Sequence, residues 1–212
     1  MKTALVTGAS SGIGKEFAIL LAQQKNNLII SARSEDKLNE IAKEIREKYN
    51  VEVTVLPHDL SKPNAGISLY ESLKDLKVNV DTVINNAGYG DYGDFVDSDT
   101  TKTIDMLNLN MVNLTELMLV FSKEMRKKKS GMILNVASTA AFQPMPKFAV
   151  YAATKAYVLH LTEAAHFELK GAGVHVCALC PGPTSTGFEL AANMGDLALF
   201  DKNAMSPVEV AK

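Results

Sequence analysis

The sequence predicts one domain built on a doubly wound parallel α/β sheet with helices on both faces. Three observations predict it. Short apolar runs alternate with longer helical stretches throughout the 212 residues, most of these runs are continuously apolar, and polar or glycine-rich segments follow several of them. Continuous apolar runs are typical of strands buried on both faces. Helices between such strands imply right-handed crossovers, and ligands bind beyond the carboxyl ends of the strands.

The elements follow one another in a regular order. Strands are expected over Thr3–Thr7, Leu28–Ala32, Val51–Leu56, Thr82–Asn85, Met132–Ala137 and Val174–Cys180. Helices are expected over Gly14–Gln24, Glu35–Tyr49, Ala65–Leu76, Thr101–Lys129 with a break, and Val150–Leu169. Ser34 precedes the second helix, and the acids Glu35 and Asp36 fall in its first turn, where the helix dipole favours them. The basic run Arg126–Lys129 ends the fourth helical stretch, where cations complement the dipole.

The composition is that of an ordinary globular chain, and its charge gives no reason to expect a nucleic-acid partner. Lys and Arg number 22 and Asp and Glu 24, which gives a formal net charge of −2, whereas nucleic-acid surfaces are basic. The longest apolar runs, such as Leu117–Phe121, are far shorter than the roughly 18 residues of a membrane span. Gly8 comes too early for the apolar region of a secretion signal. We therefore expect a cytoplasmic protein with neither nucleic acid nor membrane as a partner.

A glycine-rich segment follows the first expected strand directly. Thr7-Gly8-Ala9-Ser10-Ser11-Gly12-Ile13-Gly14 leads into an apolar helix. Glycine allows a tight turn, close approach of a pyrophosphate, and close packing of helix on strand. The helix N-terminus offers free N–H groups and a positive dipole end to phosphates. A purely structural turn is the alternative, but the strand before and the helix after favour a dinucleotide site of the Rossmann type.

The spacing of these glycines, Gly-x-x-x-Gly-x-Gly, resembles the first turn of the short-chain dehydrogenase/reductase family. Further family motifs follow in order, namely Asn85-Asn86-Ala87-Gly88, Asn110, Ser138, Tyr151-x-x-x-Lys155 and Pro181-Gly182. The resemblance covers the chain up to about Thr186. It implies a single-domain oxidoreductase that transfers a hydride between a nicotinamide cofactor and a small-molecule carbonyl or alcohol.

The residues after the second strand predict which nicotinamide cofactor binds. An NAD enzyme usually places an acid there for the ribose 2′-hydroxyl, but this chain has Ala32 at the matching position, followed by Arg33. A guanidinium pairs a 2′-phosphate through a fork of N–H donors. A solvated loop charge is the alternative for Arg33, and Glu35 and Asp36 are better explained as first-turn helix residues. We therefore expect NADPH to be preferred over NADH.

The resemblance implies further contacts with the cofactor. Asp59 resembles the family's acid that accepts from the adenine amine, with the backbone of Leu60 beside it, and a turn or helix-cap role is the alternative for Asp59. Asn85 and Asn86 are expected to brace the chain beside the cofactor ribose. A threonine after the sixth strand would reach the carboxamide. The expected cofactor-binding residues are Gly8, Ser10, Ser11, Gly12, Ile13, Gly14, Arg33, Asp59, Leu60, Asn86, Ala87, Gly88, Tyr151, Lys155, Pro181, Gly182, Thr184 and Thr186.

Tyr151 and Lys155 lie four residues apart on a predicted helix, so their side chains share one face. A free tyrosine has a pKa of about 10, and an adjacent ammonium together with the nicotinamide ring would lower that pKa. Tyr151 would then exchange a proton with the substrate oxygen, to which Ser138 would donate a hydrogen bond. By resemblance, Asn110 would bind a water that links Lys155 to solvent, and an amide satisfied within a helix kink is its alternative. The expected catalytic residues are Asn110, Ser138, Tyr151 and Lys155.

Cysteine and histidine give no signal for metal or redox chemistry. Cys177 and Cys180 are three residues apart on a strand and point to opposite faces, so buried core cysteines are expected. The four histidines are expected to be structural or exposed, and no metal site is expected.

Three segments are expected to wall the substrate pocket, namely Tyr89–Phe95, Phe142–Phe148 and the chain after Gly182. The last of these would form a lid that contains Phe188, Leu190, Met194, Leu197, Leu199 and Phe200. An apolar lid slightly favours a substrate with hydrophobic bulk, although the same residues could pack on the core.

Two other functions stay open from the sequence. Nucleotide-sugar epimerases and dehydratases share Tyr-x-x-x-Lys but usually carry Gly-x-x-Gly-x-x-Gly, and a non-catalytic NADP-binding regulator could keep the same fold.

By resemblance, a homodimer or homotetramer is expected through the helices Thr101–Lys129 and Val150–Leu169. Ser206-Pro207-Val208-Glu209 predicts a helix start. We expect residues 1–212 to form one domain that lacks the family's last helix and strand.

Overall fold

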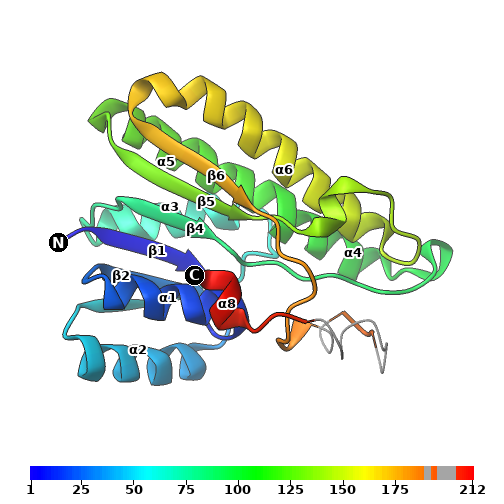
Figure 1. Ribbon diagram of the computed structural model, residues 1–212, viewed down its shortest axis with the longest axis horizontal. Coiled ribbons are helices and arrows are strands. Elements are labelled where there is room, and N and C mark those ends of the chain that lie inside the picture. The colour runs from blue at the N-terminus through cyan, green and yellow to red at the C-terminus, as the bar shows by residue number, and fades with distance from the viewer. Residues whose placement is uncertain (189–191, 195–203) are drawn as a thin grey trace.

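The computed structural model describes residues 1–188, 192–194 and 204–212, and it contains a six-stranded parallel sheet (Figure 1). The strand order is β3-β2-β1-β4-β5-β6. The strands are β1 Thr3–Thr7, β2 Asn27–Ala32, β3 Val53–Pro57, β4 Thr82–Asn85, β5 Gly131–Val136 and β6 Val174–Leu179. The main helices are α1 Gly12–Gln23, α2 Glu35–Tyr49, α3 Ala65–Asp75, α4 Thr100–Leu107, α5 Asn113–Lys128, α6 Ala149–Leu169 and α8 Pro207–Ala211. The predicted doubly wound α/β fold is confirmed.

Each face of the sheet is covered by its own set of helices. On one face, Val6 of β1 and Ile30 of β2 pack in a core with residues of α1 and α2, including Leu38. On the other face, Leu5 and Ile29 belong to a core with residues of α3, α5 and α6. Neighbouring residues of one strand thus serve opposite faces, because side chains alternate along a strand. This double burial explains the continuously apolar runs.

The long fourth helical stretch is broken, as predicted. A π-helical segment, η2 Asn108–Val112, separates α4 from α5, and π-bulges are frequent at functional sites. By length and composition, Thr100–Lys128 is also the one helical stretch in the described part of the chain that could cross a membrane, with 39% of its most apolar window buried. Core helices of globular proteins pass the same test. Here Leu117 and Phe121 of α5 are fully buried against the sheet.

The expectation of buried core cysteines is wrong for Cys177 and only partly met for Cys180. Cys177 is exposed, while Cys180 is half-buried against the core. The reason is topological, since β6 is the edge strand and pairs only with β5 within the described residues. The side chains of His175 and Cys177, which point to the same face of β6, are therefore exposed. No group of three or more His, Cys, Asp or Glu side chains that could hold a metal ion occurs in residues 1–188, 192–194 and 204–212.

The predicted helix start at Ser206 is confirmed. The Ser206 hydroxyl accepts from the backbone N–H of Glu209 at 3.2 Å, and the Glu209 carboxylate accepts from the backbone N–H of Ser206 at 2.9 Å. This reciprocal capping box begins α8, which packs against α1 (Figure 1).

Candidate active site

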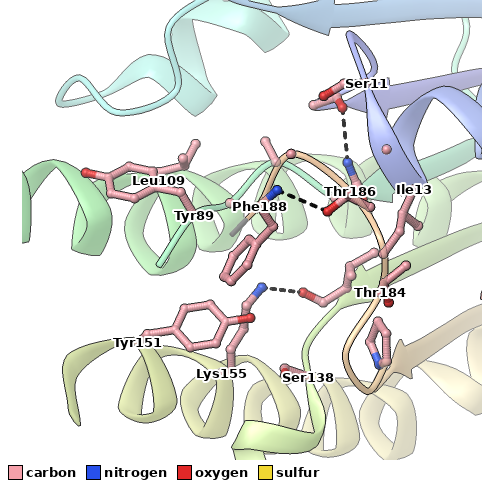
Figure 2. A pocket seen from close by; sticks show the side chains of 18 of the residues that line it. Ser11, Ile13, Tyr89, Leu109, Ser138, Tyr151, Lys155, Thr184, Thr186 and Phe188 are labelled. Atoms are coloured by element: carbon pink, nitrogen blue, oxygen red, sulfur yellow. Dashed lines mark hydrogen bonds between the residues drawn. The ribbon is translucent and has the colours of Figure 1, made fainter. Parts of the chain in front are cut away.

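One cavity of about 550 Å³ lies at the carboxyl ends of the strands. Segments that follow all six strands line it, so residues far apart in the sequence meet there (Figure 2). Of the expected site residues, the lining includes Gly8, Ser10, Ser11, Gly12, Ile13, Arg33, Asp59, Leu60, Asn86, Ala87, Gly88, Ser138, Tyr151, Lys155, Pro181, Gly182, Thr184 and Thr186. Gly14 and Asn110 lie behind this lining.

The glycine loop has the backbone geometry that a phosphate-binding turn needs. Gly8 and Gly12 adopt φ values of +66° and +54°, in the left-handed region that favours glycine. Ser11 caps α1 without a side-chain hydrogen bond to the helix, so its side chain does not occupy the N–H groups of the first turn. The Asn86 amide donates to the carbonyl oxygens of Thr7 at 3.0 Å and Gly8 at 3.3 Å. The loop is thus held open toward the cavity, and these residues fit a dinucleotide pyrophosphate.

Gly14→Ala is expected to destabilise the chain by about 1–3 kcal/mol, the usual cost of overpacking. A Cβ atom at Gly14 would clash with the carbonyl oxygen of Gly8 and the amide of Asn86. Because one of these atoms is backbone, the glycine loop must shift, and nicotinamide nucleotide affinity should fall with stability. Urea unfolding measures the first effect and fluorescence titration the second. Gly171→Ala is the control, because a Cβ there meets no atom within 4 Å. Equal stability of the two variants would contradict the packing argument.

Two cations line the cavity where the second strand ends. Arg33 lines the cavity as expected, and Lys37, in the first turn of α2, lines it as well. Sequence reasoning missed Lys37, because a lysine in an exposed helix turn carries no signal until the turn is placed over a cavity. The acids Glu35 and Asp36 are exposed and are not among the lining residues. Two cations against the one carboxylate of Asp59 leave this end of the cavity with a net positive charge.

Asp59 lines the cavity, and its carboxylate makes the contacts expected of a turn role, while its contact with the adenine stays a prediction. Its Oδ1 accepts from the backbone N–H of Ser61 at 3.0 Å and from the Ser61 hydroxyl at 2.8 Å. Burial raises the pKa of Asp59, but these hydrogen bonds and the charges of Arg33 and Lys62 outweigh it and lower the pKa overall. Asp59 thus stays ionised and fixes the turn that carries Leu60.

A second residue missed from the sequence, Asn113, holds the same turn from beneath. Asn113 is fully buried on α5, and its amide donates to the carbonyl oxygens of Leu60 at 2.7 Å and Lys62 at 2.8 Å. Its Oδ1 accepts from the backbone N–H of Gly66 at 2.8 Å. These three bonds satisfy most of a buried amide's capacity. Asn113 therefore positions the loop after β3 at the edge of the cavity.

Tyr151 and Lys155 project from α6 into the cavity, and Ser138 lies at the end of β5 beside them (Figure 2). Lys155 is buried, donates from Nζ to the carbonyl oxygen of Val136 at 2.7 Å, and lies 5.7 Å from the centroid of the Tyr151 ring. The Ser138 hydroxyl accepts from the backbone N–H of Ala140 at 3.1 Å. That bond uses the oxygen as an acceptor and leaves the hydroxyl proton for another partner, and the Tyr151 hydroxyl is such a partner in this structure.

The Asn110 side chain makes the contacts expected of an amide within a helix break, and its role in binding a water stays a prediction. The Asn110 side chain is buried in η2 and donates to the carbonyl oxygen of Tyr89 at 2.9 Å and to the Thr154 hydroxyl at 3.1 Å. Its Oδ1 accepts from the backbone N–H of Tyr89 at 3.2 Å. The amide is therefore satisfied within the helix break, where it fixes the loop after β4 against α6.

The expected substrate walls are present in part. Tyr89, Gln143, Met145, Phe148 and Phe188 line the cavity. The expectation is wrong for Phe95 and Phe142, which are exposed on short 3₁₀ segments, and Tyr92 packs behind Phe148 instead of facing the cavity. Met194 is buried with Phe148. The lid residues Leu190, Leu197, Leu199 and Phe200 lie outside the described residues.

The two expected threonines lie where the chain after β6 crosses the cavity. Thr184 is buried and donates from its hydroxyl to the carbonyl oxygen of Gly182 at 3.0 Å. Thr186 accepts from the backbone N–H of Phe188 at 3.1 Å (Figure 2). Its side chain lies against Gly12. Both hydroxyls thus have partners within their own segment.

Comparison with known proteins agrees with this geometry. The family model for short chain dehydrogenases matches residues 2–195. The chain belongs to the short-chain dehydrogenase/reductase family. A short-chain dehydrogenase from Sphingobium yanoikuyae, solved in complex with NADPH, has a TM-score of 0.92 and 30% identity, covering 100% of this chain and 82% of that one.

Curated relatives within the family carry different names. The chain is 32% identical to the very-long-chain 3-oxoacyl-CoA reductase of Mus musculus over 84% of its length and 58% of that protein's. It is 32% identical to the inactive hydroxysteroid dehydrogenase-like protein 1 of Homo sapiens over 90% of its length and 58% of that protein's. The chain thus spans little more than half the length of these curated relatives.

The pKa values at this family site differ from the prediction. Burial raises the pKa of Tyr151 to about 12, and hydrogen bonding with Ser138 offsets only part of that. Burial also lowers the pKa of Lys155 to about 8. For the protein groups alone, the pKa of Tyr151 is therefore raised instead of lowered, because desolvation of the phenolate is the largest effect. The lowering expected from the nicotinamide ring stays a prediction. Tyr151 is held in its protonated form at neutral pH.

Proposed function

We propose that this family member is an NADPH-dependent oxidoreductase that interconverts a carbonyl and an alcohol. The observation that carries the proposal is the meeting of Tyr151, Lys155 and Ser138 in a cavity that also contains the glycine loop. When bound, the nicotinamide ring supplies the hydride, and the chain supplies position and proton transfer. Gly8, Gly12 and the α1 N-terminus would hold the pyrophosphate.

In the proposed reaction, Tyr151 acts as a general acid toward the substrate oxygen. Its phenol is protonated at neutral pH, so it can donate a proton as negative charge develops on that oxygen during reduction. The hydroxyl proton of Ser138 would donate a hydrogen bond to the same oxygen. Lys155 is fixed by Val136 and would use its remaining N–H groups to hold the nicotinamide ribose.

The kcat/KM for NADPH is expected to fall as pH rises through about 8. This ratio reports ionisations of the free protein, and above this pH the buried Lys155 loses its proton and its charge. Initial rates at saturating carbonyl concentration, measured between about pH 6.5 and 9.5, give the profile. This range extends to either side of the pKa of about 8 and stays below the ordinary lysine pKa of about 10.4. A ratio that stays constant across this range would show that the charge of Lys155 is not needed for cofactor capture.

The proposed preference for NADPH rests on the positive end of the cavity. Arg33 and Lys37 line the cavity after β2, where they would bind a ribose 2′-phosphate, and the acids Glu35 and Asp36 are not among the lining residues. Thermal shift measurements with NADPH and with NADH test the proposal. A larger shift with NADPH is expected, and no shift with either nucleotide would overturn the proposed function.

A non-catalytic nucleotide-binding protein is the second candidate, because a relative of similar identity is named inactive. Tyr151, Lys155 and Ser138 are all present in this chain and share one cavity, which favours the enzyme. NADPH binding without turnover of any carbonyl would favour the second candidate.

We also propose a homodimer or homotetramer that involves α5 and α6. Exposed apolar side chains on these helices, such as Leu119, Tyr157 and Phe167, support this assembly.

A further inference from the structure

Three aromatic rings meet at Gly90, in the loop after β4. A Cβ atom at Gly90 would lie 2.9 Å from Cζ of Phe188, 3.1 Å from Cδ2 of Tyr151 and 3.2 Å from Cε1 of Phe148. The ring centroids of Tyr151 and Phe188 are 5.4 Å apart, and those of Phe148 and Tyr151 are 5.5 Å apart. The rings of this aromatic wall (Phe148, Tyr151 and Phe188) can approach so closely only because residue 90 has no side chain.

The backbone of Phe188 is held by hydrogen bonds on both sides. Its N–H donates to the Thr186 hydroxyl at 3.1 Å, and its carbonyl oxygen accepts from the N–H of Ala192 at 2.8 Å. The carbonyl oxygen of Ala192 in turn accepts from the N–H of Tyr92 at 2.8 Å. The segment that carries Phe188 is therefore tied to the loop that carries Gly90.

The aromatic wall gives one end of the cavity a definite chemical character. Met145 lines the cavity with Phe148 and Phe188, and the polar lining nearby consists of uncharged groups such as Ser138 and Gln143. In the described part of the lining, the only charged side chain beside Tyr151 is Lys155; Arg33, Lys37 and Asp59 belong to the segments after β2 and β3. A group next to the reacting carbonyl would meet aromatic carbon rather than a charge or a dense set of hydrogen-bond partners.

We propose that Phe188 is the specificity-determining residue of this site, and that the substrate is a carbonyl compound whose carbonyl carries an uncharged apolar group that packs on Phe188 and Phe148. The inference rests on the proposed reductase function. An apolar group of this kind gains affinity from burial against the rings. A sugar-like neighbour would lose hydrogen bonds to water there without replacing them.

The test compares two matched series of ketones, one with alkyl or aryl groups of increasing size and one with hydroxylated groups of the same length. For the wild-type chain, kcat/KM with NADPH is expected to rise along the apolar series and to stay low for the hydroxylated one. Phe188→Ala is expected to lower kcat/KM for the larger apolar ketones by about tenfold or more, chiefly through KM, with the KM for NADPH unchanged. Phe95→Ala is the control, since Phe95 is exposed and is not among the lining residues.

A second pair of variants tests the role of Gly90. Gly90→Ala should lower kcat for every ketone, because the new methyl group presses on both Phe188 and Tyr151. Adding Phe188→Ala should restore part of kcat for small ketones, since Tyr151 can then return to its place. A rescue of this kind would not occur if Gly90→Ala only weakened the fold, and circular dichroism and melting temperature measure that separately.

The outcomes separate the two levels of the proposal. The inference would be overturned if the ratio of kcat/KM for apolar ketones to kcat/KM for hydroxylated ketones were the same in Phe188→Ala as in the wild-type chain. A wild-type preference for the hydroxylated ketones would also overturn it. Both results would leave the reductase function standing. Absence of NADPH oxidation by the wild-type chain with every ketone would overturn the reductase function itself.

Discussion

Tyr151→Phe is expected to lower kcat for carbonyl reduction by about 10²–10⁴-fold, the usual contribution of a general acid. The substitution removes only the phenolic O–H, so no group remains to protonate the substrate oxygen. The aromatic ring stays, and its packing against Phe148 and Phe188 should keep the fold and the NADPH affinity close to those of the wild-type chain. Steady-state rates, with nucleotide affinity from fluorescence titration, measure the two effects separately.

Tyr157→Phe is a matched control on the same helix. Tyr157 is exposed on α6, and its hydroxyl lies 2.9 Å from the hydroxyl of Thr115, away from the cavity. This control should keep the wild-type rate. Near-complete activity of Tyr151→Phe would show that another group supplies the proton, and the proposed mechanism would then fail.

Combined replacement of Arg33 and Lys37 by alanine is expected to lower the preference for NADPH over NADH by about 100-fold, and each single replacement by about tenfold. Hydrogen bonds to charged groups are worth roughly 1.5–3 kcal/mol, and a tenfold change corresponds to about 1.4 kcal/mol. Exposure of Arg33 places the single effects at the lower end of that range. The ratio of kcat/KM for the two nucleotides measures the preference, and the kcat/KM for NADH itself should change little.

Lys43→Ala is the control for general loss of positive charge. Lys43 is exposed on α2 and is not among the residues that line the cavity, so its replacement should leave the nucleotide preference unchanged. If the combined Arg33 and Lys37 variant kept the wild-type ratio, the proposed recognition of the 2′-phosphate at this end of the cavity would be wrong.

The fold could be predicted from the sequence because its signals are local. Continuous apolar runs mark strands such as β1 and β4, whose bounds agree with the prediction, and Ser34 with the acids after it marks the start of α2. The glycine loop and Tyr151 with Lys155 follow strand ends, so the parallel topology alone brings them to one edge of the sheet.

Several features of the site could not be predicted from the sequence, because they depend on contacts between segments that are distant in the chain. Lys37 and Asn113 look like ordinary helix residues until α2 and α5 are placed beside the cavity and the loop after β3. The burial of Tyr151, which raises its pKa, follows from Phe148 and Phe188, and these come from two other segments. The exposure of Cys177 likewise depends on the position of β6 at the edge of the sheet.

The most direct test of the central claim follows the hydride from cofactor to product. The wild-type chain is incubated with NADPH that carries deuterium at the transferable position and with the apolar ketone series, and the alcohols are examined by mass spectrometry. We expect an alcohol with deuterium on the carbinol carbon, and loss of that product in Tyr151→Phe. NADPH that binds without forming any alcohol, or an alcohol that contains no deuterium from the cofactor, would contradict the account.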